Sequence, residues 1–279
     1  MDDDLAALAD FGARHRRLFV LTGAGCSTDS GIPDYRDAEG AWKRTPPVTF
    51  QAFMGDAGVR RRYWARSLIG WRTIGLAHPG PAHRALARLE QRERIELLLT
   101  QNVDGLHGAA GSRRSIDLHG RIDTVRCMGC EARTPRAALQ AELLRRNPDW
   151  AALEAAAAPD GDADLQERDF SGFDVPACTR CGGILKPDVV FFGESVPRDR
   201  VQAALEALGR ADAMLVAGSS LLVYSGLRFV QAALAGGKPV AAVNLGRTRA
   251  DGLFMLKVQR PVGEALAALA AEPVAAGSG

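Results

Sequence analysis

Four short apolar segments, each followed at once by small or polar residues, constrain the fold of this chain most strongly. They are Leu18–Thr22, Ile95–Thr100, Ala213–Ala217 and Val240–Asn244. Helical patterns such as Arg198–Gly209 and Leu227–Ala235 lie between some of them. Strands that alternate with helices predict an α/β fold, a parallel sheet with helices on both faces. Ligands of such sheets bind beyond the carboxyl ends of the strands, so we expect the segments that follow the strands to meet at one crevice.

The first strand continues into GAGCSTDSGIPDYRD, residues Gly23 to Asp37. A strand followed by Gly23-Ala24-Gly25 is typical of a Rossmann-like dinucleotide site, in which backbone N–H groups face the phosphates. The G-x-G-x-x-G fingerprint of dehydrogenases needs a third glycine at a position that holds Thr28 here. No acidic ribose-binding residue follows about 20 residues later either. The loop therefore indicates a nucleotide site that is not built for conventional hydride transfer.

The composition excludes several other classes of protein. A chain of 279 residues with a net charge of +2 gives no sign of broad electrostatic capture of nucleic acid or of an anionic membrane. No apolar run approaches the roughly 18–20 residues of a membrane span. The first residues, Met1-Asp2-Asp3-Asp4, are acidic, which is wrong for a secretory or mitochondrial targeting segment. We expect a cytoplasmic protein.

The five cysteines form two C-x-x-C pairs and one single residue, Cys26. Two such pairs present four thiolates at the spacing of a tetrahedral zinc site, and four sulfurs leave no open position for water. The sequence therefore predicts one structural Zn²⁺ on Cys127, Cys130, Cys178 and Cys181. A redox centre would need one C-x-x-C after a strand of a βαβ unit. A nucleic-acid-binding zinc ribbon is disfavoured by the near-neutral charge and the lack of a basic and aromatic stripe.

Two stretches interrupt the alternation of strands and helices. Residues 46–85 are rich in aromatic and basic side chains and predict a helical insert, while residues 122–190 contain both cysteine pairs. We therefore expect a Rossmann-like nucleotide-binding domain from residues 1–45, 86–121 and 191–279, with the insert and a zinc-binding module forming a smaller domain.

Three polar or extended segments are each compatible with a structural role and with a functional role. In TQNVDGLH, Asn102 or Asp104 could cap the following turn, or could bind the amide of a nicotinamide. His119 in IDLHGRID could be a packed residue or a group that transfers a proton near neutral pH. The extended run Val189–Phe192 could be a buried strand or an edge that pairs with a peptide backbone.

Together these motifs resemble those of the sirtuins, the NAD-dependent protein deacylases. GAGCSTDSGIPDYRD, TQNVDGLH, LHG, the paired C-x-x-C motifs, KPDVVFFGE, GSSLLVYS and NLG occur here in the sirtuin order, over roughly residues 10–270. RYWARSLIGW, AGSRR and GSSLLVYSGLRF resemble the class II branch, which includes the mitochondrial lipoamidase and ADP-ribosyltransferase sirtuins. Without a targeting peptide, the chain resembles a bacterial member. It departs from the pattern at Cys26, in a variable loop site, and in an alanine-rich insert between the cysteine pairs.

The resemblance implies roles for the matching residues. The diphosphate and ribose of NAD would contact Gly23, Ala24, Gly25 and Ser27, and a mobile loop with Asp34, Tyr35 and Arg36 would close over the cofactor. Nicotinamide and its ribose would contact Ile32, Gln101, Asn102 and Asp104, and the adenosine half would contact Gly218, Ser219, Ser220, Asn244 and Gly246. His119 would be the general base, with Asn102 as a second catalytic residue. An added peptide strand would lie between Val189–Gly193, including Val190, Phe191, Phe192 and Gly193, and Leu222–Ser225, including Val223 and Tyr224.

The implied reaction transfers an acyl group from lysine to ADP-ribose and releases nicotinamide and 2′-O-acyl-ADP-ribose. The implied partners are acyl-lysine proteins or peptides, and we expect a monomer that binds neither nucleic acid nor membrane. Tyr63 and Arg66 have the Y-x-x-R spacing that reads an acidic acyl group in desuccinylating sirtuins, although Arg66 could equally be a solvated helix residue. The alternatives are a protein mono-ADP-ribosyltransferase on the same scaffold and a non-catalytic NAD-sensing or zinc-ribbon module.

Overall fold

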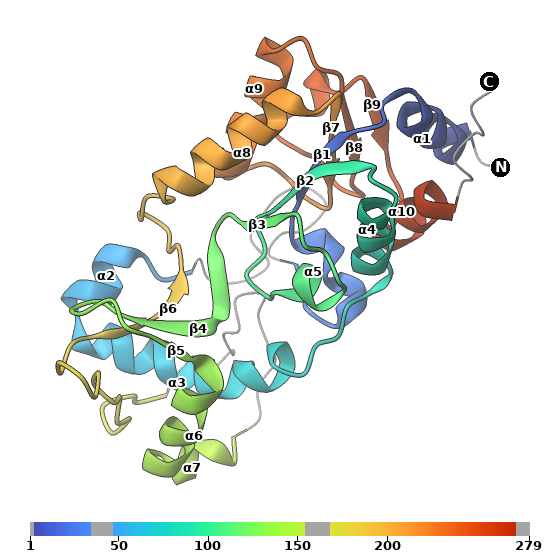
Figure 1. Ribbon diagram of the computed structural model, residues 1–279. Helices are drawn as coiled ribbons and strands as arrows, with labels where there is room; N and C mark the ends of the chain where they lie inside the picture. The colour runs from blue at the N-terminus through green and yellow to red at the C-terminus, as the bar shows by residue number, and fades with distance from the viewer. Residues whose placement is uncertain (1–2, 35–46, 154–167, 272–279) are drawn as a thin grey trace.

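A parallel sheet of six strands forms the centre of the larger part of the molecule (Figure 1). The structure is a computed structural model that describes residues 3–34, 47–153 and 168–271. The strand order is β3-β2-β1-β7-β8-β9. Their bounds are β1 Leu18–Thr22, β2 Ile95–Thr100, β3 Ser115–Asp117, β7 Ala213–Ala217, β8 Val240–Val243 and β9 Leu256–Val258. The predicted α/β fold and its four strands are confirmed.

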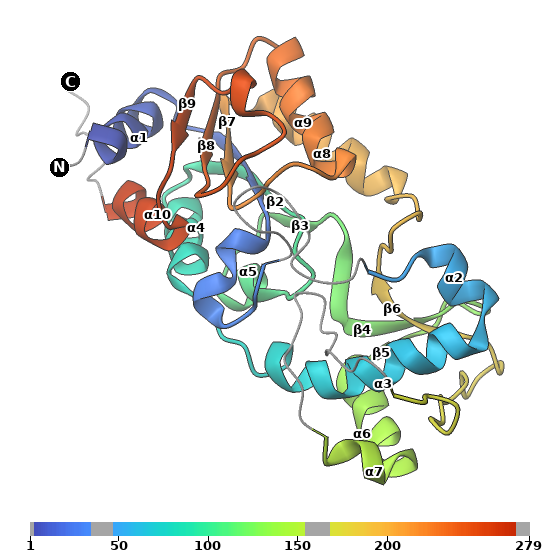
Figure 2. The same ribbon diagram turned by 180° about the vertical axis from the view of Figure 1, so that it is seen from behind.

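Helices cover both faces of this sheet, as Figure 2 shows from behind. One face packs against α1 (Asp3–Arg14), α4 (Pro81–Gln91) and α10 (Val262–Ala271), and the other against α8 (Arg198–Arg210) and α9 (Tyr224–Ala235). Alternate residues of β1 belong to the cores on the two faces of the sheet. Leu18 and Val20 lie in the core with α1, α4 and α10, and Phe19 and Leu21 lie in the core with α8 and α9. Burial on both faces is why these strands are continuous apolar runs.

The order of the strands places a switch point at the centre of the sheet. From β1 the chain adds β2 and then β3 on one side, and it later returns to add β7, β8 and β9 on the other side. The loops that follow β1 and β7 therefore leave the same edge of the sheet in opposite directions. That is the position where open parallel sheets bind their ligands.

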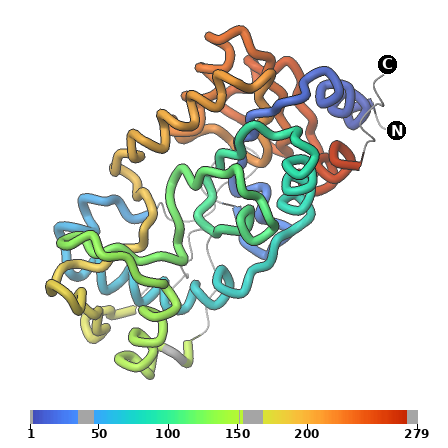
Figure 3. Tube along the Cα trace, viewed as in Figure 1, coloured from blue at the N-terminus to red at the C-terminus, as the bar shows by residue number. Residues whose placement is uncertain are grey.

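The two predicted inserts pack on each other to form a smaller unit (Figure 3). It contains an antiparallel sheet of β4 (Gly120–Cys127), β5 (Arg133–Pro135) and β6 (Leu185–Val189). Its helices are α2 (Phe50–Gly55), α3 (Ala57–Ile74), α6 (Arg136–Arg146) and α7 (Pro148–Ala151). Its core includes Phe53, Trp64, Leu68, Leu143 and Phe173. The helix α4, which begins inside the proposed insert, packs against α10 on the larger sheet instead.

Two element boundaries differ from the sequence expectation. Of the extended run predicted at Val189–Phe192, only Val189 lies in a strand, because β6 pairs with β4 over Leu185–Val189, and Phe192 forms an isolated bridge with Thr49. The helix predicted from Leu227 begins at Tyr224, directly after the extended residue Val223. The remaining short elements are α5 (Leu106–Ala109) and three 3-10 turns, Ala24–Cys26, Thr28–Ser30 and Asp251–Leu253. Among the described helices, none combines the length and hydropathy that a membrane crossing needs.

Candidate functional site

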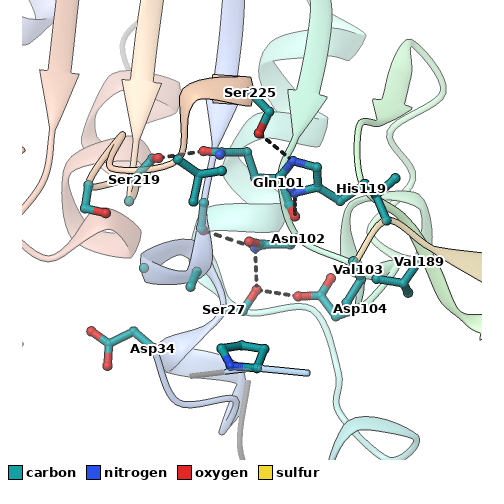
Figure 4. Close-up of a pocket in the computed structure, with 18 of the residues that line it drawn as sticks. Ser27, Asp34, Gln101, Asn102, Val103, Asp104, His119, Val189, Ser219 and Ser225 are labelled. Carbon is teal, nitrogen blue, oxygen red and sulfur yellow. Dashed lines mark hydrogen bonds between the residues drawn. The ribbon is translucent and has the colours of Figure 1, made fainter. Parts of the chain in front are cut away.

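One large cavity, of about 1020 Å³, opens at the carboxyl ends of the central strands. With the exception of Leu222, the described residues that the resemblance assigned to NAD, to catalysis or to the peptide line it, and Figure 4 shows a part of this lining. These residues are Gly23, Ala24, Gly25, Ser27, Ile32, Asp34, Gln101, Asn102, Asp104, His119, Val190, Phe191, Phe192, Gly193, Gly218, Ser219, Ser220, Val223, Tyr224, Asn244 and Gly246. Tyr63 also lines the cavity, whereas Arg66 is not among its lining residues. Tyr35 and Arg36 lie outside the described residues.

The glycine loop packs directly on the backbone that follows β7. A Cβ on Gly23 would lie 2.7 Å from the carbonyl oxygen of Gly218, and a Cβ on Gly25 would lie 2.8 Å from the Gly218 Cα. Gly218 has a φ of +64°, and a Cβ there would lie 2.6 Å from the backbone nitrogen of Cys26. Only glycine allows the two loops to approach this closely, and the approach brings the ends of β1 and β7 into one binding surface.

Ser27 is the centre of a polar cluster below the glycine loop. Its hydroxyl donates to Asp104 Oδ2 at 2.7 Å and accepts from Asn102 Nδ2 at 3.0 Å (Figure 4). Asn102 Nδ2 also donates to the carbonyl oxygen of Gly23 at 3.0 Å. The second oxygen of Asp104 accepts from the N–H of Leu106, the first residue of α5, at 2.9 Å, while the N-cap position itself is held by Gly105. Asp104 therefore supports the start of α5 and also lines the cavity, and its contact with nicotinamide stays a prediction.

Two buried histidines, which sequence analysis did not single out, support this cluster. His83 Nδ1 accepts from the Gly80 N–H at 3.1 Å, so its neutral ring carries the proton on Nε2, which points at Ser27 Oγ at 3.4 Å. Its ring lies 4.7 Å from that of His107. Burial lowers the pKa of His83, and burial followed by the nearby His83 lowers the pKa of His107 to about 3. Both rings are neutral at physiological pH. The available signal was the segment HPGPAH, where the histidine falls on the third residue of a helix that begins with proline.

His119 is half-buried and has a defined tautomer. Nδ1 lies 2.9 Å from the carbonyl oxygen of Gln101, which can only accept, so Nδ1 carries the proton of the neutral ring. Nε2 then has the lone pair and accepts from the hydroxyl of Ser225 at 2.8 Å (Figure 4). Burial lowers the pKa of His119, although the hydrogen bond to Gln101 acts in the opposite direction. The structure thus presents a neutral imidazole with a basic nitrogen at the cavity.

The loops after β2 and β7 are tied together beside this histidine. Ser219 Oγ donates to Gln101 Oε1 at 2.6 Å. Gly226 in α9 leaves room for the same amide, since a Cβ there would lie 2.6 Å from Gln101 Nε2. After β8, Asn244 Nδ2 donates to the carbonyl oxygen of Gly246 at 2.9 Å. Side chains from distant parts of the chain therefore depend on one another's positions.

The two expected peptide walls lie on opposite elements of the cavity. On one wall, the Val190 N–H donates to the carbonyl oxygen of His119 at 2.8 Å, and Gly193 has a φ of +80°. On the other wall, Tyr224 and Ser225 lie in the first turn of α9, so the expected extended stretch Leu222–Ser225 ends at Val223. The role of this stretch as a peptide wall stays a prediction, because the N–H groups in the first turn of a helix have no partner inside that helix.

The inner part of the cavity beside Tyr63 is apolar. Tyr63 is 8% exposed and packs edge-on against Phe53, with its ring 5.4 Å from that of Phe191. The cavity lining also includes Val48 and Val189 of the same apolar cluster, and Val103 and Ile122 of a second cluster that Val189 also contacts. Arg66 lies outside this lining, so the structure does not bring the Y-x-x-R pair together at the cavity.

The four paired cysteines converge in the smaller unit, where Cys127 ends β4 and Cys178 and Cys181 precede β6. Their sulfur atoms all lie within 4.8 Å of one another, with Cys127 Sγ 3.4 Å from Cys181 Sγ and Cys130 Sγ 3.8 Å from Cys178 Sγ. A tetrahedral zinc with bonds of about 2.3 Å needs sulfur separations of roughly 3.8 Å, so the geometry fits. Cys26, by contrast, is buried beside the glycine loop, and burial raises the pKa of its thiol to about 12.

The electrostatics of the cluster also fit a bound cation. Backbone N–H groups of Cys130 and Gly129 lower the pKa of Cys127 to about 6. Although the Gly183 N–H acts in the opposite direction, hydrogen bonds with Cys127 and Cys130 raise the pKa of Cys181 to about 12. Without a cation, the first thiolate makes the next one harder to form. Zn²⁺ removes this conflict, because it stabilises all four thiolates.

Comparison with known proteins gives consistent matches. The Sir2 family matches residues 23–225. A protein named NAD-dependent protein deacetylase from Xanthomonas campestris pv. campestris (strain 8004) is 66% identical over 267 residues, covering 96% of this chain and 91% of the relative. NAD-dependent protein deacetylase 2 of Bradyrhizobium diazoefficiens is 67% identical over 263 residues, covering 94% of this chain and 96% of the relative. A solved structure of a Sir2 protein with a p53 peptide and NAD+ has a TM-score of 0.74 and 29% identity, and 95% of each chain is covered.

Proposed function

The chain belongs to the Sir2 family, and on that premise we propose that it is an NAD-dependent protein-lysine deacylase. The observation that carries the proposal is one large cavity that is lined both by a neutral histidine with a basic Nε2 and by the Ser27, Asn102 and Asp104 cluster. The relatives' shared name, NAD-dependent protein deacetylase, supports deacylation over the alternatives of ADP-ribosylation or binding without turnover. A cytoplasmic location and a monomeric state stay predictions of the sequence.

We assign the binding of NAD to the glycine loop and the polar cluster. The diphosphate would lie against Gly23, Ala24 and Gly25, which have no side chain beyond a methyl group to keep it from the backbone N–H groups. The adenosine half would lie toward Ser219 and Asn244, beyond β7 and β8. Nicotinamide and its ribose would lie over Asn102 and Asp104, with Ile32 as an apolar contact. A cavity of about 1020 Å³ is large enough for NAD and an acyl-lysine side chain together.

His119 would act as the general base. In the proposed reaction the acyl oxygen of lysine bonds to C1′ of the ribose while the bond from C1′ to nicotinamide breaks. His119 Nε2 then takes a proton from the ribose hydroxyls, so that the 2′-oxygen can attack the acyl carbon. Water completes the release of free lysine and 2′-O-acyl-ADP-ribose. The Gln101 carbonyl holds the ring in the tautomer that this proton transfer needs.

Product analysis tests the proposal. With NAD and an acyl-lysine peptide, we expect one nicotinamide and one O-acyl-ADP-ribose for each lysine released, both measured by mass spectrometry. ADP-ribosylated protein without O-acyl-ADP-ribose would support the transferase instead. No nicotinamide release from acetyl, succinyl, glutaryl, lipoyl or long-chain acyl peptides would support the non-catalytic module.

The acyl preference belongs to the same proposal. The apolar lining beside Tyr63 favours acetyl and longer apolar acyl groups over acidic ones, since a buried carboxylate would need a cationic partner. The class II resemblance, with its lipoamidase members, agrees with this choice. In the same peptide panel, an Arg66→Met variant should therefore leave the ranking of acyl groups unchanged, and a selective loss of succinyl activity would restore Arg66 as the reader of an acidic acyl group.

Ser225→Ala should shift the acidic limb of the pH profile of kcat/KM to higher pH. The neutral form of His119 is the base, so activity falls as the pH decreases through its pKa. The Ser225 hydroxyl donates to the lone pair of the neutral form, and this favours that form. Without the hydroxyl the pKa of His119 rises, and the activity is lost at a higher pH. Ser225→Thr, which keeps a hydroxyl, is the control, and coincident profiles for Ser225→Ala and the parent would exclude this role.

A further inference from the structure

The mouth of the cavity carries arginines that the proposed reaction does not use. Arg198 is the first residue of α8, and Arg228 lies on the second turn of α9. Both line the cavity, and in sequence Arg198 follows the expected peptide wall that ends at Gly193, while Arg228 follows the one that ends at Ser225. Neither forms an ion pair or a side-chain hydrogen bond with any residue in the described part of the chain. Unpaired cations on both sides of a groove favour an anionic occupant.

Acidic side chains nearby do not neutralise these arginines. Glu194 is held by Lys186, with Nζ 3.1 Å from its carboxylate, and it also accepts from the Phe191 N–H. Asp199 follows Arg198 in sequence but lines a separate cavity of about 210 Å³, together with Arg200. The peptide side of the main cavity therefore carries excess positive charge.

Arg228 is placed close to the reaction centre. Its guanidinium lies 5.1 Å from the ring centroid of Tyr224, which is 56% exposed, and its Nε is buried with no hydrogen-bond partner. It lies three residues after Ser225, the partner of His119 Nε2, and so one turn further along the same helix. A turn of about 5.4 Å corresponds to one or two residues of an extended peptide, which rises roughly 3.3 Å per residue.

We propose that Arg198 and Arg228 select protein substrates that carry Asp or Glu within two residues of the acyl-lysine. The inference rests on the proposed deacylase function and names its substrate class. Charge pairs at a partly exposed mouth contribute modestly, so we expect acidic flanks to exceed basic flanks by about tenfold in kcat/KM. The preference should weaken as ionic strength rises, because exposed charges are screened.

The experiment compares three peptides that share one acyl-lysine and differ only in Asp, Asn or Lys on both sides of it. For the parent enzyme, nicotinamide release at saturating NAD should rank Asp above Asn above Lys. The ratio of the rates with the Asp and Lys peptides should fall in Arg228→Gln. It should fall further, to about twofold or less, in the double variant that also carries Arg198→Gln. Arg228→Lys keeps the charge and should restore most of the ratio. Arg88→Gln, an exposed arginine on the outer face of α4, is the matched control and should keep the full ratio.

The ratio is independent of any overall loss of activity in a variant. Equal rates for the three peptides, or an unchanged ratio in the double variant, would overturn the inference. So would a rise in the KM for NAD without a change in the ratio, since the arginines would then serve the NAD diphosphate. Binding of the same peptides with a fluorescent label, measured by anisotropy, gives the ranking without turnover. If the deacylase proposal is wrong, no peptide will give nicotinamide. The anisotropy measurement would still rank the binding of the Asp, Asn and Lys peptides.

Discussion

His119→Ala should lower the kcat of lysine deacylation by about 10²–10⁴-fold, the usual contribution of a positioned general base. No other histidine can replace it. His83 and His107 are buried behind Ser27, and burial lowers the pKa of both. The fold and NAD binding should survive, because the His119 ring is half-buried and makes two hydrogen bonds, neither of them to the glycine loop.

Rates of nicotinamide and O-acyl-ADP-ribose formation, with NAD affinity measured by calorimetry, test this expectation. His78→Ala is the matched control, because His78 is exposed and does not line the cavity. Retention of more than about a tenth of the parent kcat in His119→Ala would remove His119 from the role of base.

Cys178→Ser should lose zinc and stability together. Four-thiolate sites couple metal binding to folding, with apparent binding free energies of about 10–16 kcal/mol in small zinc domains. The Cys178 N–H donates to the Gly183 carbonyl, which closes a turn of the smaller unit. The described sulfur cluster contains only the four cysteines, so no other thiol can replace Cys178 as a ligand. We expect a melting temperature lower by about 10 °C or more, since several kcal/mol correspond to such a shift in a chain of this size.

Metal analysis by mass spectrometry and thermal unfolding measured by circular dichroism would check this result. The parent should contain one zinc per chain and Cys178→Ser close to none. Cys26→Ser is the control, because Cys26 lies by the glycine loop, where its sulfur faces the Ala217 carbonyl, and a hydroxyl can replace that contact. Undiminished zinc in Cys178→Ser would reject the four-cysteine site.

The parts of the fold that could be predicted from the sequence are those that depend on local residue patterns, such as apolar runs and cysteine spacing. The β1, β2 and β7 runs are apolar throughout because both of their faces are buried, and their ends were correct to within a residue. The spacing of Cys127 with Cys130 and of Cys178 with Cys181 indicated a site whose ligands lie about 50 residues apart, and the sulfur atoms do meet. In each case a single physical constraint, burial of a strand or the geometry of a metal site, determines the residue types within a short segment.

The parts that were missed depend on contacts between distant elements. The bond from Ser225 to His119 joins residues 106 positions apart, and the approach of His83 to Ser27 joins residues 56 apart. The segment HPGPAH marks His83 as the third residue of a helix, but no local signal shows which distant side chain His83 or Ser225 contacts. Tyr63 lines the cavity and Arg66 does not, so the Y-x-x-R spacing alone does not determine which of the two side chains reaches the cavity.

The sequence by itself determined which chemistry is available: a glycine loop at the end of a buried strand, carboxamide and carboxylate groups at the next strand end, one candidate base and four thiols. These follow from residue type and spacing, and they sufficed for the fold class and the family. Only the tertiary structure decided which nitrogen of His119 is basic, which backbone extends along the peptide walls, and which arginines face the groove unpaired. Those properties are set by the packing of α9 and α8 against the loops of the sheet, and packing brings together residues that the sequence keeps apart.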